Sequence, residues 1–180
     1  MTATGNEADR LASVIESKKT KDGVDLATLS LLSPVLVVFL RHPGCMFCRE
    51  TLAEVGRLRG SLEEAGIRIV LVHHGRLGTM QQLLAKHGLG GLDRIDDSDR
   101  SLYRAFGLRR GRISQVFGIS LWPRAISALR KHGVGIPSGD PLQMPGVFLL
   151  HRCEVVHSFR HRRISDRPDY VAMSSDFSVD

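Results

Sequence analysis

The sequence has few cysteines and no long apolar run. Three cysteines in 180 residues are an odd and small number, which does not suggest a framework of structural disulfides. The longest apolar run, residues 35–40, is far shorter than the roughly 20 residues that cross a bilayer as a helix. These features argue against a disulfide-stapled secreted scaffold and predict that the chain has no transmembrane segment.

Aromatic residues and basic blocks are also scarce. Aromatics make up 6% of the chain, with one tryptophan, and no lysine- or arginine-rich block alternates with stacking residues. The formal net charge of +6 therefore does not by itself indicate a partner, and we expect no nucleic-acid binding. Residues 1–20 are polar and mixed in charge, so we expect no secretory signal and a cytoplasmic location.

The composition is that of a globular protein, with 42% hydrophobic and 24% charged residues. The chain is long enough for one domain with a sizeable core. Residues 1–23 are largely polar, and Leu11, Val14 and Ile15 suggest one weak helical turn. We therefore predict a flexible N-terminal arm over residues 1–23 and a single domain over residues 24–180.

A buried strand, a helix and a second buried strand follow one another. Residues 35–40 form a continuous β-branched and apolar run, typical of a strand covered on both faces. From Cys45 the apolar residues recur every three or four positions, which predicts a helix ending at Gly66. Residues 67–72 repeat the strand pattern. In such a β-α-β unit the two strands are parallel, so the segments that follow them share one edge of the sheet.

The rest of the chain adds helices, a basic insertion over residues 109–131 and a hairpin. The expected elements are a helix at 80–87, a strand at 92–95, helices at 102–106 and 120–132, strands at 146–151 and 154–159, and a helix at 168–173. This order predicts an α/β, thioredoxin-like fold. It has a central mixed sheet, flanking helices and a helical insertion before the C-terminal β-hairpin.

Two of the cysteines, Cys45 and Cys48, form a C-x-x-C pair at the start of the predicted helix. The partial positive charge of a helix N-terminus stabilises a thiolate, and Arg41, His42 and Arg49 add to that field. A thiolate attacks disulfides and peroxides, and a second thiol one helical turn later is near enough to close a disulfide. The pattern predicts that these two cysteines are catalytic.

Three further residues are expected near the pair. His74 follows the second strand at the same sheet edge and is a candidate proton donor, or alternatively a turn histidine without a catalytic role. Pro145 precedes a strand that runs antiparallel to the first, so its loop faces the thiols. We expect a cis Pro145, with the backbone of Met144 available to hold an extended substrate. A trans proline at the start of a strand is the alternative.

The cysteine pair has two other interpretations. It is otherwise a pair of buried structural thiols, or half of a zinc site completed by Cys153 with His151 or His157. Along a strand, Cys153 lies about 26 Å from Pro145 at roughly 3.3 Å per residue, which places it at the opposite edge. We therefore expect no metal. A haem attachment motif is excluded because Arg49, not histidine, follows the pair.

Four segments resemble motifs of the peroxiredoxin-like 2 family, a thioredoxin-fold group in the alkyl hydroperoxide reductase and thiol-specific antioxidant superfamily. They are FLRHPGCMFCRE at 39–50, DSDRSLYRAFGL at 97–108, GDPLQMPGVF at 139–148 and SDRPDY at 165–170. The likeness covers residues 24–173. It implies thiol-dependent reduction of a peroxide-type or disulfide substrate, a thioredoxin- or glutathione-type thiol donor, and no metal or other cofactor.

The two analogies within this resemblance assign the cysteines differently. In thioredoxins the equivalent of Cys45 attacks and that of Cys48 resolves, whereas in peroxiredoxins the roles would be exchanged. We favour Cys45 as the nucleophile because the helix start exposes it more. Two other classes stay open, namely a non-catalytic redox-sensing module and an interaction protein that docks through residues 109–131. The sequence is compatible with an oligomer.

Overall fold

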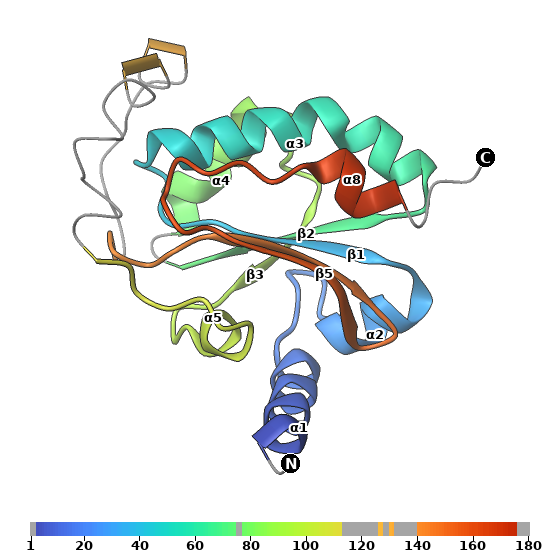
Figure 1. Cartoon of the computed structure of the whole chain (residues 1–180). Helices are drawn as coiled ribbons and strands as arrows, with labels where there is room; N and C mark the ends of the chain where they lie inside the picture. Colours follow the sequence, from blue (N-terminus) through green and yellow to red (C-terminus); the bar gives the residue numbers. More distant parts are fainter. Residues whose placement is uncertain (1–2, 75–76, 113–125, 128–129, 132–139, 176–180) are drawn as a thin grey trace.

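The computed structural model describes residues 3–74, 77–112, 126–127, 130–131 and 140–175. A sheet of five strands in the order β3-β2-β1-β4-β5 forms the centre of this described part (Figure 1). β1 to β3 run parallel to one another, β4 is antiparallel to β1, and β5 is antiparallel to β4. The strands are β1 (Val35–Phe39), β2 (Arg68–His73), β3 (Asp93–Asp96), β4 (Gly146–His151) and β5 (Glu154–Arg160). The predicted mixed sheet and thioredoxin-like fold are confirmed.

Helices cover both faces of the sheet (Figure 1). One face carries α3 (Met46–Glu64), α4 (Leu77–Lys86) and α8 (Tyr170–Ser174), and the other carries α1 (Ala3–Ser17), α2 (Leu26–Leu32) and α5 (Ser101–Ala105). The predicted crossover helix is therefore α3, which connects β1 to β2. Its chain reverses at Gly66, whose φ of +72° is a conformation that glycine adopts without steric cost.

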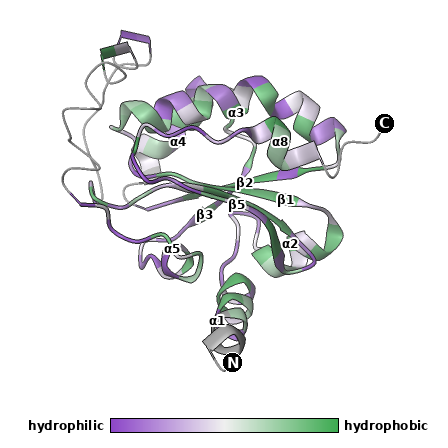
Figure 2. Cartoon of the chain, viewed as in Figure 1, coloured by the Kyte–Doolittle hydropathy of each residue, from purple (hydrophilic) through white to green (hydrophobic). Residues whose placement is uncertain are grey.

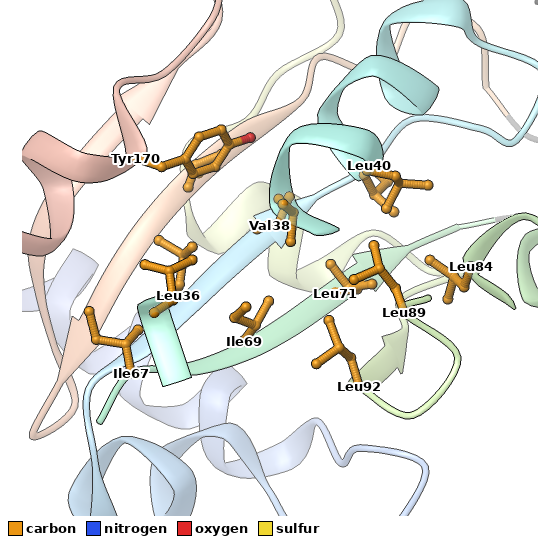
Figure 3. Packing of buried hydrophobic residues seen from close by; sticks show 14 of the residues in the cluster. Leu36, Val38, Leu40, Ile67, Ile69, Leu71, Leu84, Leu89, Leu92 and Tyr170 are labelled. Atoms are coloured by element: carbon orange, nitrogen blue, oxygen red, sulfur yellow. The ribbon is translucent and has the colours of Figure 1, made fainter. Parts of the chain in front are cut away.

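The central strand β1 is buried along its whole length, so its alternating side chains fill two cores. Leu36 and Val38 point toward α3 (Figure 3), whereas Val35, Val37 and Phe39 belong to the cluster on the other face. Figure 2 shows the same division, with green strands between helices whose outer surfaces carry purple residues. This burial on both faces explains why the strand reads as an unbroken apolar run.

The N-terminal segment is more ordered than one weak helical turn. Residues 3–17 form α1, and Ile15 is fully buried in the core cluster on the α5 side of the sheet. Lys18 then forms a salt bridge with the buried Asp97 at 3.0 Å. The apolar residues singled out in the sequence thus supply a docking face for the helix. The division of the chain at residue 23 stays a prediction.

Most of the predicted insertion lies outside the described residues. Residues 126–127 and 130–131 are helical and exposed, in agreement with the expected helix at 120–132, while the remainder of that helix and Trp122 fall outside the described part of the chain. Within the ranges that the structure describes, no helix is both long and apolar enough to cross a membrane.

Gly146, the first residue of β4, lies against two side chains of the core. A Cβ atom built on it would come within 2.7 Å of Leu108 Cδ2 and 3.0 Å of Phe148 Cε2. Both neighbours are buried and have little room to move. We expect Gly146→Ala to lower the free energy of unfolding by about 1–3 kcal/mol, as overpacked cores do, measured by urea denaturation.

Gly60 in α3 provides the matched control, because a Cβ atom there meets nothing within 4 Å. Gly60→Ala should raise the free energy of unfolding by about 0.5–1 kcal/mol through better helix propensity. Equal stabilities of the Gly146→Ala and Gly60→Ala variants would contradict the packing argument.

Candidate active site

The cysteine pair lies at the edge of the sheet where β1 and β2 end. Cys45 is the N-cap residue of α3, with an extended backbone at φ −77° and ψ 122°. Its N–H donates to the His42 carbonyl at 3.0 Å, and its carbonyl accepts from Arg49 N at 3.2 Å. The turn at residues 41–45 therefore aims the Cys45 side chain at the positive end of the helix dipole.

Both thiols are free and buried, with Cys45 6% and Cys48 3% exposed. Arg41 contacts both of them: its backbone N–H donates to Cys48 Sγ at 3.3 Å, and its guanidinium Nη1 donates to Cys45 Sγ at 3.1 Å. A guanidinium this close to a sulfur stabilises the thiolate form. The predicted order of exposure agrees with the structure, although the difference between the two thiols is small.

Arg41 is itself held by carbonyl oxygens from a distant part of the chain. Its Nε donates to the Gln143 carbonyl at 3.0 Å, its Nη2 donates to the Pro141 carbonyl, and the residue is 2% exposed. These partners leave Nη1 for Cys45. The segment before β4 thus fixes the charge that faces the thiols.

The two cysteines are pushed in opposite directions. A hydrogen bond from the Cys48 thiol, the charge of Arg41 and the backbone N–H groups of Cys48 and Phe47 lower the pKa of Cys45 to about 6, against the opposing effect of burial. The shared hydrogen bond, burial and the adjacent Cys45 thiolate raise the pKa of Cys48 well above its usual value. At pH 7 Cys45 is therefore a thiolate and Cys48 a thiol that donates to it.

The predicted histidines lie at the same edge but are uncharged at neutral pH. Burial, followed by nearby positive charges, lowers the pKa of both His42 and His74 to about 4. The His74 ring packs edge-on against Tyr103, with ring centroids 5.3 Å apart. A positively charged histidine therefore does not assist the thiolate, which corrects the expectation for His42. The role of His74 in proton transfer stays a prediction.

Arg49 lies in the first turn of α3, where its Nε donates to the Pro43 carbonyl at 3.2 Å. Its side chain has a named partner in the turn rather than a contact with either sulfur among the printed distances of this site. Its proposed contribution to the thiolate field stays a prediction.

The loop before β4 faces the thiols as predicted, but two details of the prediction are wrong. No peptide bond among the described residues is cis, so the Met144–Pro145 bond has the trans form that most X–Pro bonds prefer. The Met144 backbone is also occupied, because its N–H donates to the Arg109 carbonyl and its carbonyl accepts from Gln143 Nε2, both at 3.3 Å. It is not available to hold an extended substrate, whereas the Met144 side chain packs in one apolar cluster with both cysteines.

Two residues of the site were not identified from the sequence. Gln143 is 3% exposed and supplies the carbonyl that holds Arg41. His161 donates its backbone N–H to the Pro145 carbonyl at 3.4 Å, and burial lowers the pKa of its side chain to about 4. Each lies more than a hundred positions from Arg41 or Cys45 in the chain, and only the neighbourhood of Pro145 hinted at Gln143.

Cys153 lies far from the pair, in the turn that joins β4 to β5. Its N–H donates to Ser30 Oγ at 3.0 Å, beside α2. This is the opposite end of β4 from Gly146, as the strand-length argument predicted. The structure therefore does not bring Cys153, His151 or His157 to Cys45.

Solved structures share this arrangement of strands and helices. The Xanthomonas campestris bacterioferritin comigratory protein is 15% identical, with a TM-score of 0.58 over 89% of this chain and 86% of that chain. A secreted Mycobacterium tuberculosis disulfide oxidoreductase is 14% identical, with a TM-score of 0.55 over 94% of this chain and 96% of that chain. At such identities the likeness establishes the fold alone.

Curated relatives extend the comparison to the sequence. The chain is 30% identical to the prostamide/prostaglandin F synthase of Bos taurus over 148 residues, which is 77% of this chain and 70% of that protein. It is 29% identical to the Homo sapiens protein of the same name over 150 residues, which is 78% of this chain and 72% of that protein. The family model described as AhpC/TSA antioxidant enzyme matches residues 56–163. The matched part begins after Cys48, so the case for the cysteine pair rests on the geometry above. The sequence resemblance is confirmed at the level of the superfamily, and the chain belongs to the AhpC/TSA antioxidant enzyme family.

Proposed function

We propose that the protein is a thiol-dependent oxidoreductase that uses Cys45 and Cys48 as a dithiol/disulfide centre to reduce a peroxide-type or disulfide substrate. The observation that carries the proposal is the contact of the Arg41 guanidinium with Cys45 Sγ at 3.1 Å, in a site where Cys48 keeps its proton. One group is thus an attacking thiolate and the other a protonated resolving thiol, which is the division of labour that two-step thiol chemistry needs.

With a disulfide substrate, the Cys45 thiolate attacks one sulfur and the other sulfur leaves as a thiolate, which takes up a proton. The Cys48 thiol then loses its proton and attacks Cys45 Sγ, which breaks the mixed disulfide and releases the second thiol. The products are two substrate thiols and a Cys45–Cys48 disulfide. Two electrons have passed from the enzyme to the substrate.

With a hydroperoxide, the Cys45 thiolate attacks the terminal oxygen, and the alkoxide leaves with a proton as an alcohol. The sulfenic acid on Cys45 then condenses with the Cys48 thiol to form the disulfide and water. A thioredoxin- or glutathione-type donor returns two electrons and two protons in either case. Because curated relatives are named prostamide/prostaglandin F synthases, lipids of the prostaglandin class belong in the substrate screen.

A pulse of stoichiometric hydrogen peroxide tests this proposal. We expect it to convert the two free thiols to a Cys45–Cys48 disulfide, located by mass spectrometry, and a thioredoxin to reopen that disulfide. If peroxide leaves both thiols free and a disulfide substrate also fails to oxidise them, the enzyme proposal is refuted. A disulfide that forms and reopens without turnover would instead favour a non-catalytic redox-sensing module.

A further inference from the structure

A groove of about 780 Å³ lies beside the candidate active site on the other face of the sheet. α1 and α5, which neighbour each other in Figure 1, form part of its walls together with residues 107–110. Its described lining has no acidic side chain but contains six arginines, which are Arg10, Arg100, Arg104, Arg109, Arg110 and Arg160.

The described part of the chain neutralises little of this charge. Asp140 is the carboxylate that pairs with two of the six arginines, contacting Arg100 at 2.5 Å and Arg110 at 2.7 Å. Arg104 and Arg160 donate instead to backbone carbonyl oxygens, at 2.7 and 3.0 Å. Guanidinium groups gathered in one groove repel one another unless an anion lies between them, and they favour carboxylate or phosphate oxygens in paired geometry.

The groove shares a wall with the redox centre. Gln143 lines the groove, and its carbonyl accepts the hydrogen bond from Arg41 Nε, while Arg41 Nη1 contacts Cys45 Sγ. A ligand seated in the groove therefore lies one arginine side chain away from the thiolate. The groove is well placed to hold a molecule that must also reach Cys45.

The size and composition of the groove favour a polypeptide over a small anion. Its volume far exceeds that of one phosphate, and Leu11, Ala8 and Ala105 interrupt the arginines. Carboxylates spaced along an extended chain match separated guanidinium groups, and apolar side chains between them match the gaps. Complementary charge of this kind chiefly speeds the encounter of two proteins.

We propose that the arginine groove docks an acidic segment of the protein thiol donor that reduces the Cys45–Cys48 disulfide, an inference that rests on the proposed function. In the docked complex a donor thiolate attacks Cys45 Sγ and Cys48 leaves as a thiolate that takes up a proton. The second donor thiol, on losing its proton, attacks the donor sulfur of the mixed disulfide and frees Cys45. The donor dithiol becomes a disulfide, and the enzyme disulfide becomes two thiols.

The double variant Arg10→Gln/Arg109→Gln tests the groove, because both side chains are exposed and neither has a printed partner within the described residues. We expect its disulfide to be reduced by an acidic thioredoxin about tenfold more slowly than that of the wild type. Reduction by uncharged dithiothreitol should stay within about twofold. A fluorescent hexaglutamate peptide should bind the wild type and bind this variant at least about tenfold more weakly.

The double variant Arg57→Gln/Lys86→Gln is the matched control, since it removes the same charge from exposed positions of α3 and α4. Equal thioredoxin rates in the groove and control variants would overturn the docking proposal. Displacement of the peptide by tripolyphosphate, with the thioredoxin rate unchanged, would identify a small-anion site instead. If neither donor reduces the wild-type disulfide, the proposed function itself fails, and the peptide titration then reports separately on the groove.

Discussion

Cys45→Ser is expected to abolish turnover with a hydroperoxide and a thioredoxin donor, lowering the rate at least about 10³-fold to the uncatalysed background. Serine lacks a group that ionises at neutral pH, so the hydrogen bond from Arg41 has no anion to stabilise. Cys48→Ser should also stop turnover but for another reason, since the first attack still occurs. Its Cys45 should accumulate as a sulfenic acid or as a mixed disulfide, detected by mass spectrometry after trapping with dimedone.

Cys153→Ser serves as the control, because Cys153 lies in the hairpin turn beside Ser30, at the far end of β4. It should retain full turnover. The opposite pattern of trapped adducts, with Cys48 modified in Cys45→Ser and nothing on Cys45 in Cys48→Ser, would exchange the two roles. That result would favour the peroxiredoxin-like assignment over the thioredoxin-like one.

Arg41→Gln is expected to raise the pKa of Cys45 from about 6 by about 1–2 pH units, since an opposite charge has been removed from hydrogen-bond range. The Cys45 thiolate forms as the pH rises through its pKa. Alkylation of the wild type should therefore increase between pH 5 and 7 and then level off, while that of Arg41→Gln continues to increase above pH 7. At pH 7 the variant should react about tenfold more slowly.

The pH dependence separates this electrostatic effect from a structural one. At pH 9 the variant thiol is largely ionised, and its higher pKa makes it intrinsically more nucleophilic, so its rate should recover to that of the wild type. Arg57→Gln removes an exposed charge from the same helix and should leave the profile unchanged. A variant that is slow at every pH would show that Arg41 acts by shaping the loop rather than by its charge.

The sequence predicted the parts of this molecule that depend on local patterns. A continuous apolar run identified β1, because a strand buried on both faces has no polar positions. The change to helical spacing at Cys45 located the start of α3 to within one residue. Together they placed the cysteine pair at a sheet edge with His74, since the handedness of β-α-β units fixes where parallel strands end.

The features that the sequence did not predict depend on contacts between distant segments. Gln143 holds Arg41 through a backbone carbonyl, and a carbonyl carries no side-chain signal. The trans Pro145 was predicted as cis because its position, but not its isomer, follows from the strand order. The docking of α1 through Ile15 and the convergence of arginines from four separate segments likewise require the tertiary structure.

The attachment of Arg41 to the Gln143 carbonyl has a consequence for the newly made chain. The two residues are 102 positions apart, and β4 must pair with β1 before the carbonyl reaches the guanidinium. Contacts across such separations form late, after most of the chain is available. Until then Cys45 lacks the fixed positive charge and has the sluggish chemistry of an ordinary cysteine. The nascent protein is thereby protected from oxidants, and its reactive sulfur is switched on only when the sheet is complete.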